Sequence, residues 1–86
     1  MRIQLPSPLL DYTGGARHVI AAGGTLDELL RDLDRQYPGI RFRMVDEQDR
    51  IRPHIRIFIN ADLERSLDAT LDASHPVLIV AALSGG

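Results

Sequence analysis

Residues 25–39, TLDELLRDLDRQYPG, have the repeat of a helix that is apolar along one side. The apolar residues recur at the i, i+3, i+4, i+7 and i+11 spacing that forms one continuous stripe. They are Leu26, Leu29, Leu30, Leu33 and Tyr37. Thr25 and Glu28 form a capping box that begins the helix, and Pro38 ends it. We therefore predict a helix from about Leu26 to Tyr37 whose stripe packs on a sheet, because a small domain must cover its sheet.

Two short segments before this helix have the alternating pattern of strands. Ile3 and Leu5 alternate with polar residues within residues 2–5, and a second strand is expected over residues 17–21. The Thr13-Gly14-Gly15 stretch between them is a turn signal, because glycine supplies the positive φ angles that tight turns need. We predict that the two segments pair as a hairpin.

Residues 40–54, which follow the helix, are mixed in character. We expect Ile40, Met44 and Val45 to form a short turn that packs on the edge of the sheet. The charged stretch DEQDR, residues 46–50, is expected to be an exposed loop.

Two further strands are predicted in the second half of the chain. Residues 55–59, IRIFI, alternate and are rich in β-branched side chains. Asn60-Ala61-Asp62 then turns the chain into a short element near residues 63–65. Residues 77–83, VLIVAAL, are apolar on both faces, which is typical of a central strand with a neighbour on each side.

The order of hairpin, helix and further strands predicts an α+β domain with the β-grasp fold. In this fold a mixed sheet of four to five strands carries one main helix on one face. A chain of 86 residues is long enough for one domain only. We expect residues 1–81 to form the domain and residues 82–86 to form a flexible tail.

Composition excludes several classes of function. The absence of cysteine rules out thiolate metal sites and a cysteine nucleophile. His18, His54 and His75 are scattered without ligand spacing, so we expect neither a metal site nor a catalytic set. The net charge of −2 lacks the basic bias of nucleic-acid binders, and no stretch approaches a signal peptide or the roughly 20 apolar residues of a membrane span. We therefore expect a cytoplasmic protein that binds neither nucleic acid nor membrane.

The chain ends in VAALSGG, and this end is its most unusual chemical feature. Five extended residues, 82–86, reach about 17 Å, which is enough to enter the active site of another protein. Gly85 and Gly86 have no Cβ and can pass a narrow channel, and the unhindered Gly86 carboxylate is open to adenylation by an enzyme. We expect Leu83, Ser84 and the two glycines to thread a partner's active site. The alternative is that the two glycines are only a frayed end.

The last strand also predicts an apolar patch beside this tail. Leu78 and Val80 alternate with residues that face the helix, so they lie on the opposite face of the sheet, and Phe58 lies there by the same alternation. An exposed apolar patch usually marks a protein interface, and threading a tail requires a second, larger contact. We predict that these three residues dock a partner. They could instead be covered by residues 40–50 or by a second copy of the chain.

Over nearly its whole length the sequence resembles the ubiquitin-like sulfur-carrier (MoaD/ThiS) family, which contains the small subunit of molybdopterin synthase and the sulfur carrier of thiamine biosynthesis. It is most similar to the branch that feeds cysteine synthesis. The matching stretches are LLDYTGG, GGTLDELLRDLDRQYPGI, IRIFIN and the closing VLIVAALSGG. Two turns, NADLE and DASHP, depart from the family's usual patterns, which affects loop contacts to particular partners.

The resemblance implies a protein carrier that is not itself an enzyme and holds no cofactor. An ATP-dependent activating enzyme would adenylate Gly86, and sulfur from a donor would displace AMP to leave a thiocarboxylate on Gly86. In the cysteine-type pathway, this thiocarboxylate would attack an acceptor on a pyridoxal-phosphate enzyme that resembles a cysteine synthase. ATP and pyridoxal phosphate would therefore belong to the partners.

Other functions are compatible with the same sequence features. The carrier could serve molybdopterin, thiamine or a secondary metabolite. The same activated Gly86 would also suit a ubiquitin-like protein modifier that forms isopeptide bonds with lysines of its targets. A binding module with an inert tail is the third class.

Overall fold

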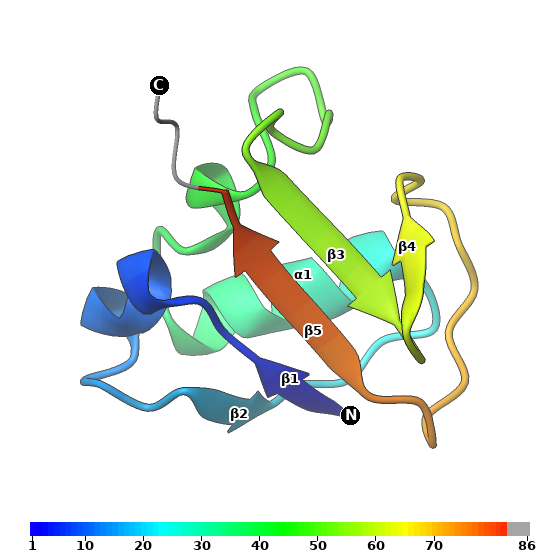
Figure 1. Ribbon diagram of the computed structural model, residues 1–86, viewed down its shortest axis with the longest axis horizontal. Coiled ribbons are helices and arrows are strands. Elements are labelled where there is room, and N and C mark those ends of the chain that lie inside the picture. Colours follow the sequence, from blue (N-terminus) through cyan, green and yellow to red (C-terminus); the bar gives the residue numbers. More distant parts are fainter. Residues whose placement is uncertain (83–86) are drawn as a thin grey trace.

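The computed structural model describes residues 1–82. Five strands form one mixed sheet in the order β2-β1-β5-β3-β4, and one main helix lies across one face of it (Figure 1). The elements in chain order are β1 (Arg2–Gln4), η1 (Ser7–Tyr12), β2 (His18–Ile20), α1 (Leu26–Gln36), η2 (Arg41–Arg43), β3 (Ile55–Ile59), β4 (Asp62–Glu64) and β5 (Val77–Ala81), where η marks a 3₁₀ helix. The predicted α+β architecture, a β-grasp, is confirmed.

The last strand, β5, occupies the centre of the sheet, as its two apolar faces predicted. It runs parallel to β1 and antiparallel to β3. Val77 lies opposite Ile3 of β1, and Ile79 lies opposite Ile57 of β3. The predicted hairpin is also present, because β1 and β2 pair antiparallel. The chain therefore runs toward its end through the middle of the sheet.

The helix begins and ends almost where its sequence signals predicted. The Thr25 hydroxyl accepts a hydrogen bond from the Glu28 N–H at 3.2 Å, and the Glu28 carboxylate accepts one from the Thr25 N–H at 3.1 Å. At the other end Tyr37 caps α1, and its N–H donates to the Leu33 carbonyl at 2.8 Å. The four leucines of the stripe, Leu26, Leu29, Leu30 and Leu33, are fully buried. This face of the helix packs against the inner face of the sheet.

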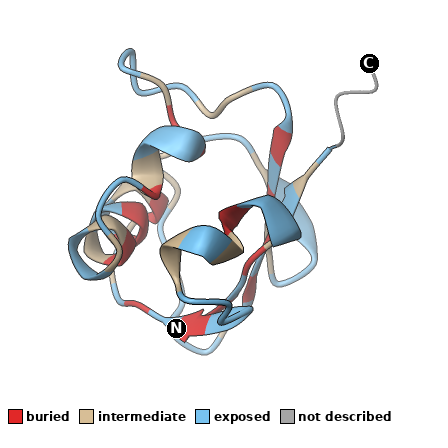
Figure 2. Cartoon of the chain, turned by 90° about the vertical axis from the view of Figure 1, so that its left-hand side faces the viewer, coloured by how far each residue is buried: buried red, intermediate tan, exposed pale blue. Residues whose placement is uncertain are grey.

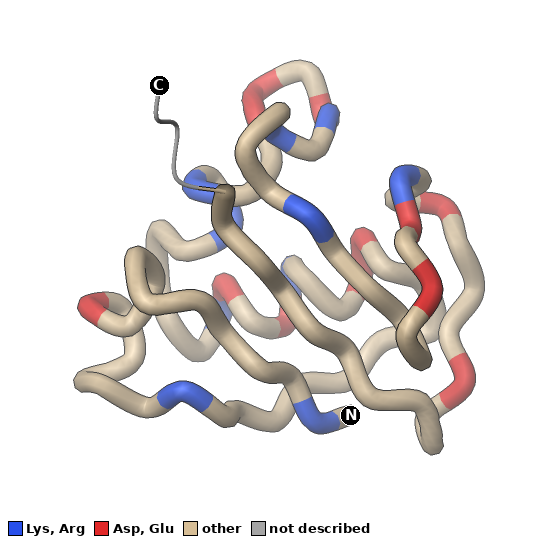
Figure 3. Tube along the Cα trace, viewed as in Figure 1, with Lys and Arg blue, Asp and Glu red and all other residues tan. Residues whose placement is uncertain are grey.

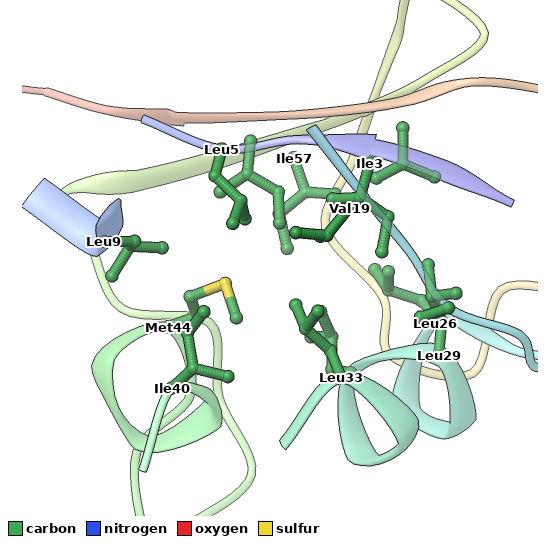
Figure 4. Packing of buried hydrophobic residues seen from close by; sticks show 14 of the residues in the cluster. Ile3, Leu5, Leu9, Val19, Leu26, Leu29, Leu33, Ile40, Met44 and Ile57 are labelled. Atoms are coloured by element: carbon green, nitrogen blue, oxygen red, sulfur yellow. The ribbon is translucent and has the colours of Figure 1, made fainter. Parts of the chain in front are cut away.

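The prediction for Ile40, Met44 and Val45 was wrong in its placement. Their side chains are fully buried and belong to the main core instead of packing on the sheet edge. Figure 4 shows Ile40 and Met44 in the layer between the sheet and the helices, close to Leu9 and Leu33. These residues fill the end of the core that the short helix α1 leaves uncovered. The loop that follows them, residues 46–50, is largely exposed, as predicted.

The 3₁₀ helix η1 was not predicted. Pro6 precedes this short helix and Pro8 lies in its first turn, where a missing N–H is tolerated, and the helix buries Leu9. Figure 2 shows this helix with its buried side toward the interior. The turn signal after it is confirmed, since Gly14 and Gly15 have φ angles of 65° and 93°.

A tight turn joins β3 to β4. Ile59 pairs with Asp62, so the loop contains only Asn60 and Ala61, and both have positive φ angles of 51° and 72°. Two-residue hairpins of this kind favour Asn-Gly, because an L side chain at positive φ is strained. Alanine at the second position is therefore an unfavourable choice in this turn.

Ala61→Gly is expected to stabilise the protein by about 0.5–1 kcal/mol. The substitution removes about 1–2 kcal/mol of backbone strain from the folded state. Part of this gain is lost, because glycine gives the unfolded chain more conformational entropy. Urea unfolding measures the change. Ala73→Gly is the matched control, because exposed Ala73 lacks a positive φ and should gain nothing. Equal effects of the two substitutions would contradict the assignment of strain to Ala61.

Candidate functional site

The end of β5 lies beside the start of β3. Ala81 pairs with Ile55, and the N–H of Ala82 donates to the His54 carbonyl at 2.7 Å, which continues the ladder by one bond. The residues predicted to thread a partner and to accept sulfur lie outside the described residues. They are Leu83, Ser84, Gly85 and Gly86. Their roles stay predictions.

The three residues of the predicted patch lie on the outer face of the sheet, away from α1. Leu78 and Val80 are 38% and 37% exposed, and Phe58 is half-buried opposite Leu78. The intervening residues of the two strands, Ile57 and Ile79, are buried against the helix. We call Phe58, Leu78 and Val80 the outer patch. It is apolar and spans β3 and β5, with Val80 next to the end of β5 and Leu78 and Phe58 nearer its beginning.

Residues 40–45 do not cover the outer patch. Ile40 and Met44 pack on the opposite side of the sheet, in the core that Figure 4 shows. Residues 46–50 are largely exposed, and Leu78 and Val80 stay exposed with the whole segment 40–50 in place, so this segment does not cover them. Cover by a second copy of the chain is still open as an alternative.

Leu63 extends the outer patch and was not predicted as part of it. It is 42% exposed and pairs directly with Phe58, so the two side chains share one face of the sheet. The signal that would have identified it is the two-residue turn at Asn60 and Ala61, because that loop length fixes the register of β4 against β3.

Three hollows lie beside β5, one at its beginning and two that reach its end. One of about 630 Å³ is lined by Phe58, Leu78 and Pro76 at the beginning of β5, away from its end. Two smaller ones, of about 410 Å³ and about 350 Å³, both include Ala81 in their walls. The end of the central strand is thus flanked by concave surface on both sides.

The carboxyl groups with clearly lowered pKa values serve helix and turn structure. The Ala22 N–H and the Arg35 guanidinium lower the pKa of Asp32. Hydrogen bonds from Ser74 lower the pKa of Asp72. Among residues 1–82, no group of three or more His, Asp or Glu side chains is arranged to hold a metal ion. In the same part of the chain no helix has the length and apolar character needed to span a bilayer.

Comparisons with solved structures find close matches to the whole fold. A chain of the crystal structure of the Amycolatopsis orientalis BexX/CysO complex superposes with a TM-score of 0.90 at 27% identity, covering 99% of this chain and 98% of that chain. Mycobacterium tuberculosis CysO, described as an antigen, gives 0.89 at 26% identity, covering 95% of this chain and 98% of that chain. SAMP1 from Haloferax volcanii, at 22% identity, gives 0.81 with 100% and 98% coverage and shares the fold.

Comparison of sequences gives the family. The sulfur carrier protein CysO of Mycobacterium tuberculosis is 30% identical over 89 residues, covering 98% of this chain and 96% of that protein. The ThiS family matches residues 3–86, which includes the Gly-Gly end. These matches confirm the predicted resemblance. The relatives are small protein carriers and not enzymes. The chain belongs to the ThiS family and is a sulfur carrier of the CysO type.

Proposed function

We propose that the chain carries sulfur as a thiocarboxylate on Gly86. The Gly86 carboxylate attacks the α-phosphate of ATP in an activating partner and releases pyrophosphate, which leaves an acyl-adenylate. A sulfur donor then attacks the acyl carbon, AMP leaves, and a carbon–sulfur bond replaces a carbon–oxygen bond. Because the first step consumes ATP, we place the protein in the cytoplasm.

The position of β5 is the observation that carries this proposal. The strand runs through the centre of the sheet, and its last residue, Ala81, lies five residues before Gly86. A central strand is held by hydrogen bonds on both sides, so the scaffold gives the tail a fixed point of departure. The outer patch beside that point supplies the larger contact that threading of a tail requires.

We propose cysteine synthesis as the route that receives the sulfur. The curated relatives are named CysO, and that name is what supports this route over the molybdopterin, thiamine and secondary-metabolite routes. The acceptor is then a cysteine-synthase-like enzyme that contains pyridoxal phosphate. A CysO chain occurs in a complex with BexX in Amycolatopsis orientalis. That complex supports the expectation that this chain also works through a protein partner.

Intact-mass spectrometry tests the sulfur step directly. The protein is incubated with ATP, sulfide and the activating enzyme, and it should gain the mass of one oxygen-to-sulfur exchange, which tandem spectra place on Gly86. The control omits ATP and should show no change. An unchanged mass in the complete reaction, with pyrophosphate released, would refute the proposal.

A second experiment, in cells, tests whether the chain is a protein modifier. The likeness to SAMP1 concerns the fold and does not favour conjugation for this chain. Immunoblots of cells that express a tagged chain would show abundant high-mass adducts if Gly86 formed isopeptide bonds. Abundant adducts without thiocarboxylate would favour the modifier over the carrier.

Leu78→Asp is expected to raise the KM of the activating enzyme for this carrier about tenfold, which corresponds to about 1.4 kcal/mol of lost docking energy. The new carboxylate must be desolvated when the outer patch meets its partner. Pyrophosphate release measured against carrier concentration gives the KM. Ile20→Asp is the matched control, because Ile20 is 64% exposed on the edge strand β2. Equal changes in KM for both variants would contradict docking through the outer patch.

A further inference from the structure

The cationic side chains of this protein are ten arginines, and they fall into two groups. Four form ion pairs with aspartates on the helix or in the loop that follows η2. They are Arg31, Arg35, Arg41 and Arg50. Of the other six, which make no ion pair with carboxylates of residues 1–82, four line hollows beside β5 or pair with it near its end. They are Arg17, Arg43, Arg52 and Arg56, and we call them the arginine collar.

The collar lies on both sides of the end of β5. Arg17 lines the hollow of about 350 Å³, and Arg43 and Arg52 line the one of about 410 Å³. Ala81 belongs to both hollows, so the strand ends between them. Arg56 sits opposite Val80 in the β3–β5 ladder. Figure 3 shows arginine positions on η2, on the segment before β3 and on β3, close to where β5 ends.

Neutral groups of the protein hold the side chains of the collar. The Arg52 Nε–H donates to the Phe42 carbonyl at 2.7 Å, and its guanidinium lies 4.5 Å from the centroid of the Phe42 ring. Arg17 donates to the Leu5 carbonyl and to the Ser7 hydroxyl, both at 3.2 Å.

The other two collar arginines are held in the same way. Arg56 donates to the Pro53 and Ile55 carbonyls. The Arg43 guanidinium lies 5.9 Å from the centroid of the Tyr12 ring. Carbonyls and aromatic rings fix the direction of a guanidinium without cancelling its charge, whereas a carboxylate would do both. Within residues 1–82, the four guanidinium groups are therefore positioned and form no ion pair. Asp46 is a carboxylate near Arg52, since the Arg50 N–H and, as smaller causes, the charges of Arg50 and Arg52 lower its pKa.

We propose that the arginine collar binds acidic side chains of the activating partner at the mouth of the site that receives the tail. This inference rests on the proposed function. Guanidinium groups bind carboxylates through paired, parallel hydrogen bonds, and arginine is enriched at protein interfaces. Like charges that gather around one strand end repel each other, and a complementary acidic rim removes that cost. The rim then orients the carrier so that β5 points into the partner.

The overall charge favours an acidic protein surface over a nucleic acid. The chain has a net charge of −2, whereas nucleic-acid binders are usually basic along an extended stripe. Paired charges at the rim of an interface act mainly on the rate of association and on its dependence on salt. The collar is accordingly expected to steer the partner, while the outer patch supplies the apolar contact.

A peptide titration tests the carboxylate preference of the collar without any partner enzyme. Hexaglutamate is added to the ¹⁵N-labelled protein at low salt, and amide shift changes should gather at the four collar positions and around Ala81. Arg43→Gln/Arg56→Gln should lose most of these changes. Arg35→Gln/Arg65→Gln removes the same charge elsewhere and should keep them. Evenly spread shift changes, equal losses in both double variants, or tighter binding of oligothymidylate than of hexaglutamate would overturn the proposal.

A kinetic measurement then tests the collar in the reaction. With the activating enzyme, Arg43→Gln/Arg56→Gln should raise KM several-fold at low salt with kcat unchanged, and the difference from the parent should vanish near about 1 M salt, where the screening length falls to about 3 Å. The Arg35→Gln/Arg65→Gln control should keep the parent KM. An unchanged KM in the collar variant would overturn the proposal. Failure of the oxygen-to-sulfur exchange would instead refute the carrier function, and the peptide titration would be unaffected by it.

Discussion

Deletion of Gly86 is expected to abolish the oxygen-to-sulfur exchange and to leave the free energy of unfolding unchanged. The deletion moves the terminal carboxylate back to Gly85, one residue short of the position that the activating enzyme would attack. One residue is about 3.5 Å of extended chain, and misplacement of reacting atoms by about 1 Å already costs about a hundredfold in rate. Intact-mass spectrometry after incubation with ATP, sulfide and the activating enzyme measures the loss.

The stability of the same deletion variant is its internal control. Every buried hydrophobic residue among residues 1–82 lies between Ile3 and Ile79, so the folded core does not depend on Gly86. Urea unfolding of the parent and the deletion variant should therefore coincide. Full retention of function in the receiving pathway by the deletion variant would remove both the carrier and the modifier functions and would leave a binding module with an inert tail.

Gly86→Ala tests whether the terminal carboxylate must be unhindered, because the substitution keeps the length of the chain and adds only a methyl group. The carboxylate keeps its place in this variant, but a methyl group now stands beside the acyl carbon and in the channel. We expect slower loading than in the parent and faster loading than in the deletion variant. Equal loading of Gly86→Ala and the parent would contradict a channel that admits only glycine.

The helix and the central strand were predictable because their signals are local. The capping box at Thr25 and Glu28 satisfies the first N–H groups of α1 without help from the rest of the fold. The apolar run of β5 predicted its central position in the sheet, although only its inner face, with Val77 and Ile79, is buried. The outer direction of Leu78 and Val80 then follows from the period of two alone.

The elements that were not predicted depend on contacts between distant segments. The 3₁₀ helix η1 is too short to show an apolar repeat in the sequence. Leu9 is buried because the core extends to that end of the sheet. Ile40 and Met44 enter the core for the same reason.

The arginine collar was also beyond prediction. Its members come from separate segments of the chain, namely the residue before β2, η2, the segment before β3, and β3 itself, and only the tertiary fold brings them near β5. That they form no ion pair with carboxylates of residues 1–82 is a property of the fold, since other arginines, such as Arg31 and Arg41, pair with aspartates.

Leu30→Ala is expected to destabilise the protein by about 2–5 kcal/mol, the largest effect on stability among the substitutions considered. Leu30 is fully buried, in the middle of the helix face that covers the sheet. The cost combines the lost transfer of the side chain from water with a cavity that the neighbouring leucines cannot fill. Small domains have only about 5–15 kcal/mol of stability in total, so the loss is a large fraction. Guanidinium unfolding measures it.

Arg31→Ala is the control for this substitution, because Arg31 follows Leu30 on the same helix but is exposed to solvent. Its ion pair with Asp27 is on the surface and contributes little, so the unfolding curve should barely move. A loss of only a few tenths of a kcal/mol for Leu30→Ala would contradict its central place in the core. The folded fraction of Leu30→Ala should still load sulfur normally. Leu30→Ala would thus lower the free energy of unfolding without affecting sulfur loading, whereas deletion of Gly86 would abolish sulfur loading without affecting stability. This opposite behaviour is what we expect if the folded domain serves only to present its reactive C-terminus.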